Sequence, residues 1–263
     1  MLEACRARSP RSTRRTVEAE VFGRPESVTV THGVQEALFL LFDALLRPGD
    51  QVIAFNPGWQ PLMGLPPRLG ASVTVLPYGP GMSVDAAAVT AAAGENLRLI
   101  ALNSPCNLPP ASGSRRRNCG CWLRWWRSGT PVCSSARSTR SVCRAPPVCR
   151  APRAVGQDRV ISVSGLSRTY GLPGLRTGWV YGAPQVAEAC AERRFLTSIA
   201  SSVLCEAVAC SALDRHEDYV QAYHPLCAPR LGAHREMGGL PPGCRPAGAA
   251  AGHSLRLDTT ANR

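Results

Sequence analysis

A turn around Gly33 contains residues whose type and spacing could bind an anion. Thr31-His32-Gly33 forms a strand-to-helix turn, and an amphipathic helical pattern begins at Gln35. The first N–H groups of a helix have no partner within the helix, and the helix dipole adds partial positive charge beside them. A glycine turn that leads into a helix therefore favours a phosphate.

The basic residues have two explanations. All thirty are Arg, none is Lys, and the formal net charge is +12. Taken at face value, this charge predicts an acidic partner such as nucleic acid or a membrane surface. A GC-rich genome also produces a composition rich in Arg, Ala, Pro and Gly and free of Lys, so the charge does not require such a partner.

Cysteine spacing and hydropathy exclude several classes of protein. Twelve Cys in 263 residues do not make a disulfide miniprotein, and no Cys/His spacing matches a zinc site, so we expect no metal. No apolar run reaches about 18 residues, and no N-terminal segment resembles a signal peptide. We therefore expect a cytoplasmic protein that does not enter the membrane.

Alternating helices and strands must position the Gly33 turn. Apolar periodicity and Gly/Pro punctuation predict helices at 35–46, 84–93 and, largely, 184–213, and strands at 51–55, 71–76, 97–102, 159–163 and 178–181. Strands that alternate with helices favour an α/β fold with a mostly parallel sheet sandwiched by helices.

The chain divides into regions of different composition. Residues 21–235 contain the expected α/β domain, whereas 1–20 are irregular and basic and 236–263 form an irregular tail. Within the domain, residues 115–153 contain ten Arg, five Cys and three Trp, but no Asp or Glu. Neither helical nor strand periodicity persists there, so we predict that residues 115–155 are disordered.

Four motifs, in order along the chain, resemble those of the class I/II aminotransferases, enzymes of fold type I that depend on pyridoxal phosphate. The first three are short, whereas the fourth matches over sixteen residues in register. The resemblance implies the large domain of that fold. The motifs are Thr31-His32-Gly33-Val34-Gln35-Glu36-Ala37-Leu38, Pro57-Gly58-Trp59, Asn103-Ser104-Pro105-Cys106-Asn107 and Ser164-Gly165-Leu166-Ser167-Arg168-Thr169-Tyr170-Gly171-Leu172-Pro173-Gly174-Leu175-Arg176-Thr177-Gly178-Trp179.

The resemblance also implies a set of cofactor-binding residues. In the family, the glycine turn, the helix start and an arginine that falls at Arg176 hold the cofactor phosphate. An aromatic ring at Trp59 stacks on the pyridine, and an Asn at Asn107 hydrogen-bonds the ring hydroxyl oxygen. The candidate residues are Gly33, Val34, Gln35, Trp59, Asn107, Ser167, Tyr170 and Arg176.

The sequence departs from the family at the position that matters most for catalysis. Arg168 replaces the Schiff-base lysine, and an arginine stays protonated and cannot attack a carbonyl as an amine can. No catalytic residue is therefore intact. Gly165 replaces a Ser or Thr, Leu108 replaces a Pro, and the Asp that pairs with the pyridinium nitrogen has no match between 107 and 158. The small C-terminal domain is expected to be largely missing.

A change of reading frame is one hypothesis for residues 115–155. The shifted frame joins the third base of each codon to the first two bases of the next codon. If third positions are GC-rich, the codons of residues 115–134 then encode an amphipathic helix, a turn and the start of a strand. Trp125-Trp126 has only one codon choice, and it yields Val. The alternative is a real basic, aromatic segment that binds nucleic acid or an anionic membrane. We favour the frameshift, because it also accounts for much of the charge.

The resemblance leaves several functions open. The first is an aminotransferase-like protein that acts on an α-amino acid and a 2-oxo acid, is homodimeric when intact, and is inactive as written. The second is a non-catalytic ligand-binding or regulatory domain, or a decayed gene product. The third is a pyridoxal-phosphate-dependent amino-acid cyclase or hydroxylase of an antibiotic pathway, because such enzymes share the Gly171–Arg176 stretch.

Overall fold

The structure, a computed structural model, describes residues 25–79, 84–103, 132–135, 160–215, 218, 219 and 222. Its centre is a seven-stranded sheet with the strand order β1-β7-β6-β5-β4-β2-β3. The strands are β1 Val28–Thr31, β2 Gln51–Asn56, β3 Ser72–Pro77, β4 Leu97–Asn103, β5 Val132–Ser135, β6 Val160–Gly165 and β7 Gly178–Tyr181.

The sheet is parallel apart from one strand. β7 runs antiparallel to both of its neighbours, β1 and β6, whereas the remaining pairs are parallel. Parallel strands are buried on both faces and are therefore continuously apolar. The buried run from Val52 to Phe55 in β2 follows this rule, as does the run from Leu99 to Leu102 in β4.

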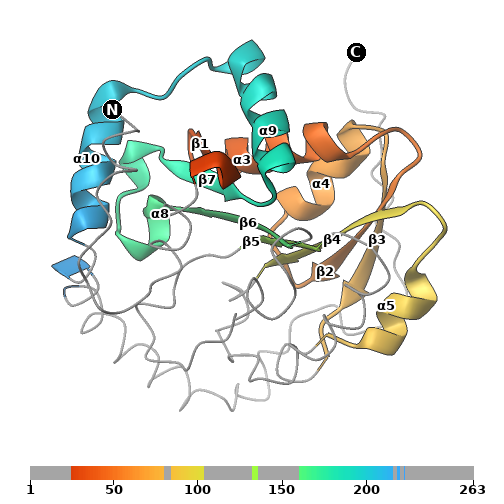
Figure 1. The fold of residues 1–263 in the computed structure, drawn as a ribbon. Coiled ribbons are helices and arrows are strands. Elements are labelled where there is room, and N and C mark those ends of the chain that lie inside the picture. The colour runs from red at the N-terminus through yellow and green to blue at the C-terminus, as the bar shows by residue number, and fades with distance from the viewer. Residues whose placement is uncertain are drawn as a thin grey trace, which may run out of the picture.

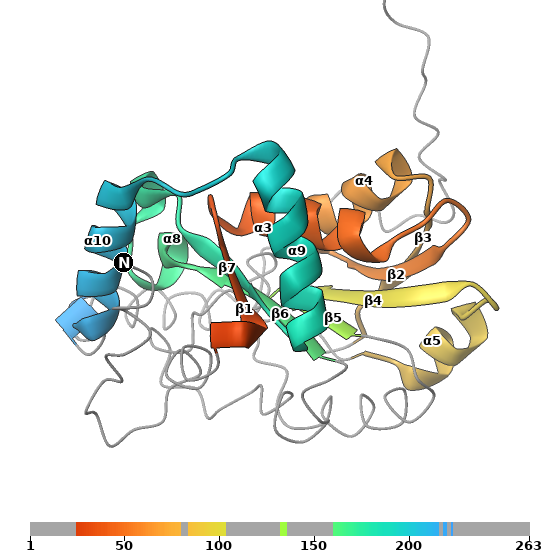
Figure 2. The ribbon, with the colours of Figure 1, turned by 45° about the horizontal axis from the view of Figure 1, so that its top comes forward.

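Helices cover both faces of the sheet, so the predicted sandwich is confirmed (Figures 1 and 2). Apolar residues of α3, α4 and α9 pack on one face, whereas α5 packs on the other face and α8 and α10 pack beside β7. The helices are α3 Val34–Leu45, α4 Pro61–Arg68, α5 Ala86–Ala92, α8 Leu166–Thr169, α9 Pro184–Thr197 and α10 Val203–Asp214, with 3-10 turns η1 Pro25–Ser27 and η4 Pro173–Leu175.

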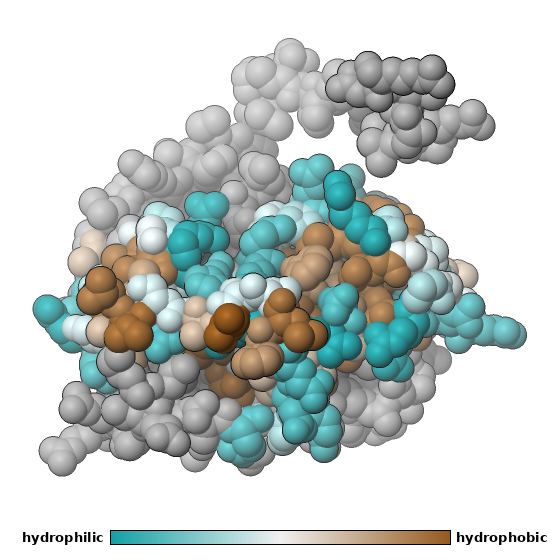
Figure 3. Space-filling view, turned by 90° about the horizontal axis from the view of Figure 1, so that it is seen from above, coloured by the Kyte–Doolittle hydropathy of each residue, from teal (hydrophilic) through white to brown (hydrophobic). Residues whose placement is uncertain are grey.

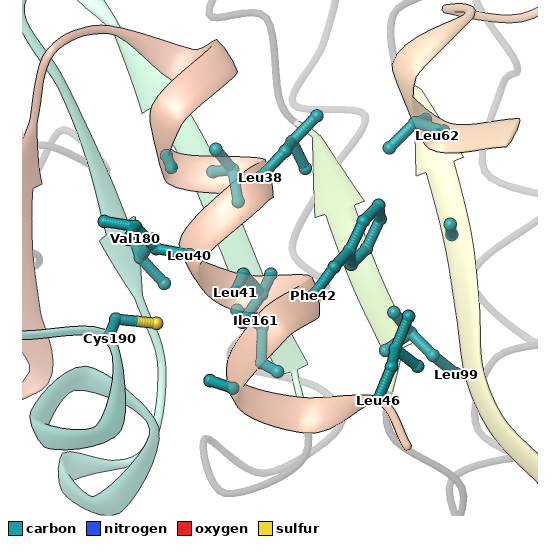
Figure 4. Packing of buried hydrophobic residues seen from close by; sticks show 14 of the residues in the cluster. Leu38, Leu40, Leu41, Phe42, Leu46, Leu62, Leu99, Ile161, Val180 and Cys190 are labelled. Carbon is teal, nitrogen blue, oxygen red and sulfur yellow. The ribbon is translucent and has the colours of Figure 1, made fainter. Parts of the chain in front are cut away.

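The α3 helix forms the centre of the main core (Figure 4). Leu38, Leu41 and Phe42 are completely buried against the sheet. Each such side chain contributes about 1.5–3 kcal/mol on burial. Cys190 of α9 belongs to the same cluster, and burial raises the pKa of its thiol to about 12 despite the nearby Arg193. The thiol is therefore neutral and packs as a small apolar group. This core fixes the direction in which the N-terminus of α3 points.

The strand β5 corrects one prediction. Residues 132–135 lie in the segment predicted to be disordered, yet they form a strand between β4 and β6. Val132 pairs with Ile100 on one side and with Val160 on the other. Without a strand here, the backbone groups of both neighbours would lack partners, so even the short Val-Cys-Ser-Ser run is stabilised in this position. The predicted disorder is therefore wrong for residues 132–135, whereas residues 115–131 and 136–155 lie outside the described residues.

Helix α4 was not predicted, because Pro66 and Pro67 lie within it. A proline has no N–H to donate to the preceding turn and normally ends a helix. Here the helix does end at once: the Leu69 and Gly70 N–H groups bond to the carbonyls of Pro66 and Pro67 in tight turns.

The predicted helical region 184–213 is also interrupted, at Ser198–Ser202, where Ile199 has a positive φ of 58°.

Two sequence expectations concern the surroundings of the fold. In the part of the chain that the structure describes, no helix is long and apolar enough to cross a membrane. The expected irregular ends, 1–20 and 236–263, lie outside the described residues.

Candidate cofactor site

Three turns meet at one edge of the sheet. Because β1 and β6 both run antiparallel to the strand between them, their carboxyl ends lie at the edge where β7 begins. Gly178, the first residue of β7, pairs with Thr31 on one side and with Gly165 on the other. In α/β sheets, ligands bind outside the carboxyl ends of the strands. This edge is therefore the candidate site.

Glycines allow the three turns to approach one another. A Cβ atom added at Gly178 would lie 2.7 Å from the Gly33 carbonyl carbon and 2.8 Å from the Val34 nitrogen. One added at Gly165 would lie 2.7 Å from the Thr177 carbonyl oxygen. Real Cβ contacts are not this short, so no larger residue fits either position without moving the backbone. In this structure the Ser or Thr hydroxyl of the family has no room at residue 165.

The N-terminus of α3 opens onto this edge. Gly33 has a φ of 81°, a left-handed conformation that glycine adopts without strain, and its N–H donates to the Thr31 carbonyl oxygen at 2.8 Å. The first bond of the helix runs from the Ala37 N–H to the Gly33 carbonyl. Gly33 provides no side chain to cap the helix, so the amides of Val34 and Gln35 belong to the first turn, whose N–H groups can bind an anion.

Arg176 supplies a positive charge at the same place. Its Nη2 lies 2.7 Å from the position that a Cβ atom would take at Gly33. The side chain is exposed, its Nη1 donates to the Pro173 carbonyl at 3.2 Å, and its backbone is left-handed with a φ of 48°. The structure thus brings together Gly33, Val34, Gln35 and Arg176, four of the residues named from the sequence. A guanidinium group beside a helix N-terminus is well suited to a phosphate.

The residues of the α8 turn differ in their surroundings. Arg168, at the expected lysine position, is exposed, and Ser167 is half-buried. Tyr170 is buried in the cluster formed with α10, where its ring makes an edge contact with Tyr219 at 5.6 Å between centroids. Core packing therefore accounts for Tyr170, whose predicted role near the cofactor stays a prediction.

The two remaining candidates lie farther along the sheet. Trp59 is half-buried, follows the cis Asn56–Pro57 bond at the end of β2 and packs against the α3 core cluster. Asn107 lies outside the described residues, and β4 ends at the buried Asn103 just before it. The stacking and hydroxyl contacts predicted for Trp59 and Asn107 stay predictions.

Sequence reasoning missed the role of Glu36 beside the turn. Its Oε2 accepts a hydrogen bond from the His32 backbone N–H at 2.6 Å, and the His32 Nδ1 lies 3.3 Å from the same oxygen. Burial raises the pKa of the carboxyl, but the hydrogen bonds from His32, the nearby Ser198 hydroxyl and the charge of His32 hold it below its ordinary value. The i, i+4 spacing of His32 and Glu36 was visible in the sequence and could have indicated this pair.

The residues present fit the phosphate of pyridoxal phosphate but not its covalent attachment. Backbone amides and Arg176 provide donors for an anion, whereas Arg168 provides no amine. Among the described residues, no three His, Cys, Asp or Glu side chains come together as a metal site would require.

Comparison with known proteins shows what the chain is similar to. The model of the family "Aminotransferase class I and II" matches residues 139–226. Capreomycidine synthase of Streptomyces vinaceus is 35% identical over 223 residues, which cover 83% of this chain and 54% of that protein. The chain therefore resembles the class I and II aminotransferases.

Other aminotransferases support this assignment. Arginine–pyruvate transaminase of Pseudomonas aeruginosa is 26% identical over 89% of this chain and 60% of its own length. The crystal structure of aspartate aminotransferase from Thermotoga maritima shares the fold, with a TM-score of 0.73 and 24% identity over 81% of this chain and 58% of that one. The chain therefore spans slightly more than half the length of these three relatives. The family cofactor is pyridoxal phosphate.

Proposed function

We propose that this chain is an aminotransferase-like protein that binds pyridoxal phosphate by its phosphate group and forms no covalent bond with it. The Arg176 guanidinium beside the Gly33 turn carries the proposal. Helix amides and a permanent positive charge recognise a phosphate without help from a lysine.

The chain's own residues can supply only part of the family chemistry. Pyridoxal phosphate, when bound, supplies an aldehyde and an electron-accepting ring for reactions at the α-carbon of an amino acid. Gly33, Val34, Gln35 and Arg176 would hold and orient its phosphate. The group at residue 168 would have to move a proton and exchange its bond to the cofactor, and a guanidinium does neither at neutral pH. We therefore propose that the chain does not turn over amino acids or 2-oxo acids.

Cofactor binding and covalent attachment can be measured separately. Equilibrium dialysis of the full chain should show that pyridoxal phosphate binds more tightly than pyridoxal, which lacks the phosphate. Treatment with borohydride should leave no cofactor mass on any side chain, because the sequence contains no Lys. Equal binding of the two compounds would refute the phosphate site, and a reduced adduct on residue 168 would refute the non-covalent mode.

A second candidate function follows from one comparison. The 35% identity to capreomycidine synthase favours the cyclase-type alternative over a simple transaminase. The two differ in outcome, because a transaminase releases a 2-oxo acid whereas a cyclase retains the amino group on its product. Product analysis with a lysine restored at position 168, in a chain completed to the length of its relatives, would separate them. Cofactor binding without any turnover by that protein would favour a regulatory role.

We also propose that the protein forms a homodimer through α9 and α10. Monomeric proteins rarely expose large contiguous apolar patches, and such patches commonly mark an interface. Apolar side chains are visible on the face that carries α3, α4 and α9 (Figure 3). The exposed apolar residues of α9, α10 and the segment between them are Phe195, Leu196, Ile199, Val203, Leu204 and Val208. Sedimentation of the chain should show a dimer that the double change Phe195→Ser and Leu196→Ser dissociates.

The frameshift stays a proposal about the gene. The family match begins at residue 139 and leaves out most of the Arg-rich segment. The strand β5 shows that the sequence as written can fill the central position of the sheet at residues 132–135. Nucleotide sequence across codons 107–158 tests the idea directly, because third bases that do not permit the shifted reading would refute it.

A further inference from the structure

The carboxylate of Glu36 lies beside the candidate phosphate site and holds the residue that precedes Gly33. It accepts a hydrogen bond from the His32 backbone N–H at 2.6 Å and lies 3.3 Å from the His32 ring nitrogen. Glu36 therefore restrains both the backbone and the ring of His32.

The position of Glu36 resembles a helix capping box. Glu36 is the third residue of α3 after the Gly33 cap, and its side chain reaches back to an N–H that precedes the helix. In a capping box, a Glu at this position satisfies a backbone donor at the helix start. Here the donor belongs to His32, one residue earlier, so the bond restrains the strand-to-helix turn itself.

Two opposing effects act on an anion bound at this turn. A bond between a backbone N–H and a charged carboxylate is stronger than a neutral one and restrains the Gly33 amide and its neighbours. The carboxylate is also a negative charge near an anion site, which opposes phosphate binding. The hydrogen bond from the His32 backbone N–H holds this carboxylate at the turn, where its side chain is 17% exposed.

We propose that Glu36 is a positioning residue for the phosphate site, holding the His32–Gly33 turn in the conformation that presents the α3 amides to the anion. This inference rests on the proposed function, since it concerns the same site. Arg176 supplies charge to that site, whereas Glu36 supplies geometry and does not touch the ligand.

The experiment compares Glu36 with a second carboxylate of the same helix. Asp43, farther along α3, forms an ion pair with Arg193 of α9 at 2.8 Å. Glu36→Ala and Asp43→Ala each remove one carboxylate contact of α3, but only the first lies at the turn. Glu36→Gln keeps an oxygen that can accept the His32 bond, and His32→Ala keeps the backbone donor while removing the ring.

The measurement is the affinity of each full-length variant for pyridoxal phosphate relative to pyridoxal, together with hydrogen exchange of the amides in residues 32–37. In Glu36→Ala we expect the ratio of the affinity for pyridoxal phosphate to the affinity for pyridoxal to fall roughly 10-fold. The amides of residues 32–37 should also exchange faster. In Glu36→Gln and in His32→Ala the same affinity ratio should stay within roughly 3-fold of its value in the unmodified chain. In Asp43→Ala the ratio should be unchanged.

Three results would overturn the role of Glu36. Tighter phosphate binding by Glu36→Ala would mean that charge repulsion dominates over positioning. An equal loss in Asp43→Ala would mean that general loosening of α9 explains the effect. Unchanged amide exchange in Glu36→Ala would show that the turn needs no tether, a test that does not require cofactor. Failure of the unmodified chain to prefer pyridoxal phosphate would instead refute the proposed function.

Discussion

The turns at Gly33 and at Arg168 meet at the same sheet edge but offer different chemistry. Both follow parallel strands that flank Gly178, and both depend on glycines for their close approach. The phosphate site proposed at the Gly33 turn would use backbone amides, which every residue except proline provides. The chemistry that the resemblance implies at residue 168 requires one particular side-chain amine, and a guanidinium cannot replace it. In the proposed function, anion binding by backbone therefore tolerates sequence change that covalent chemistry does not.

The largest effect should come from a change at the glycine that both turns contact. Gly178→Val places a Cβ atom within 2.8 Å of the Val34 nitrogen, so the backbone of one turn must move. We expect a loss of about 3 kcal/mol or more in the free energy of unfolding, measured by urea denaturation. Gly174→Ala is the matched control, because nothing lies within 4 Å of an added Cβ there, and it should change stability by less than about 0.5 kcal/mol. Equal stabilities would show that the turns are not packed as described.

A change at Arg176 should affect the Gly33 turn alone. The side chain is exposed, so Arg176→Gln should leave the unfolding free energy within about 0.5 kcal/mol. Loss of a charge-assisted bond should weaken pyridoxal phosphate binding by roughly 10-fold to 100-fold and leave pyridoxal binding unchanged. Titration with both compounds checks this. A parallel loss for pyridoxal would mean that Arg176 contacts another part of the cofactor.

Restoring the amine should alter the Arg168 turn without repairing the enzyme. Arg168 is exposed, so Arg168→Lys should change stability by less than about 0.5 kcal/mol. Mass spectrometry after borohydride should detect cofactor attached to residue 168. Turnover should stay near background, because residues that act as a unit are strongly non-additive and the pyridinium partner has no match in the sequence. Measurable transamination by this variant would show that residues 115–155 supply a working part of the site.

The smallest effect should be the pH dependence contributed by Glu36. Its pKa in the folded chain lies below the ordinary value of 4.5, so its contribution to stability is present above pH 4.5 and is lost as the pH falls through the folded value. The stability difference between the unmodified chain and Glu36→Gln should therefore be constant near neutral pH and shrink below pH 4.5. Unfolding curves at several pH values would measure it. A difference that grows on acidification would contradict the direction of the shift.

Much of the fold could be read from local patterns. The predicted strand 178–181 matches β7, and the helix predicted at 35–46 matches α3 within one residue. Both carry apolar patterns with clear boundaries, which local sequence encodes. The misses were α4, whose prolines oppose a helix, and β5, whose four residues are weakly apolar. In both cases tertiary packing outweighed local preference.

The candidate site was only partly visible in the sequence. The Gly33 turn and Arg176 lie more than a hundred residues apart, and only the resemblance joined them before the structure did. Tyr170 belongs to the same motif as Arg176, yet the fold buries it against α10. A linear motif gives residue types, but the direction of each side chain depends on the face of the sheet that its element covers.

The sequence by itself determined the family resemblance, the absence of a lysine amine and the alternation of helices and strands, because these depend on residue identity and local periodicity. Only the tertiary structure decided that Gly33, Gly165 and Gly178 meet, because strand order and the reversed direction of β7 are set by long-range packing. The tertiary structure also decided that Asp43 of α3 meets Arg193 of α9, a residue 150 positions away. Long-range contacts of this kind form only when apolar burial has fixed the helices against the sheet.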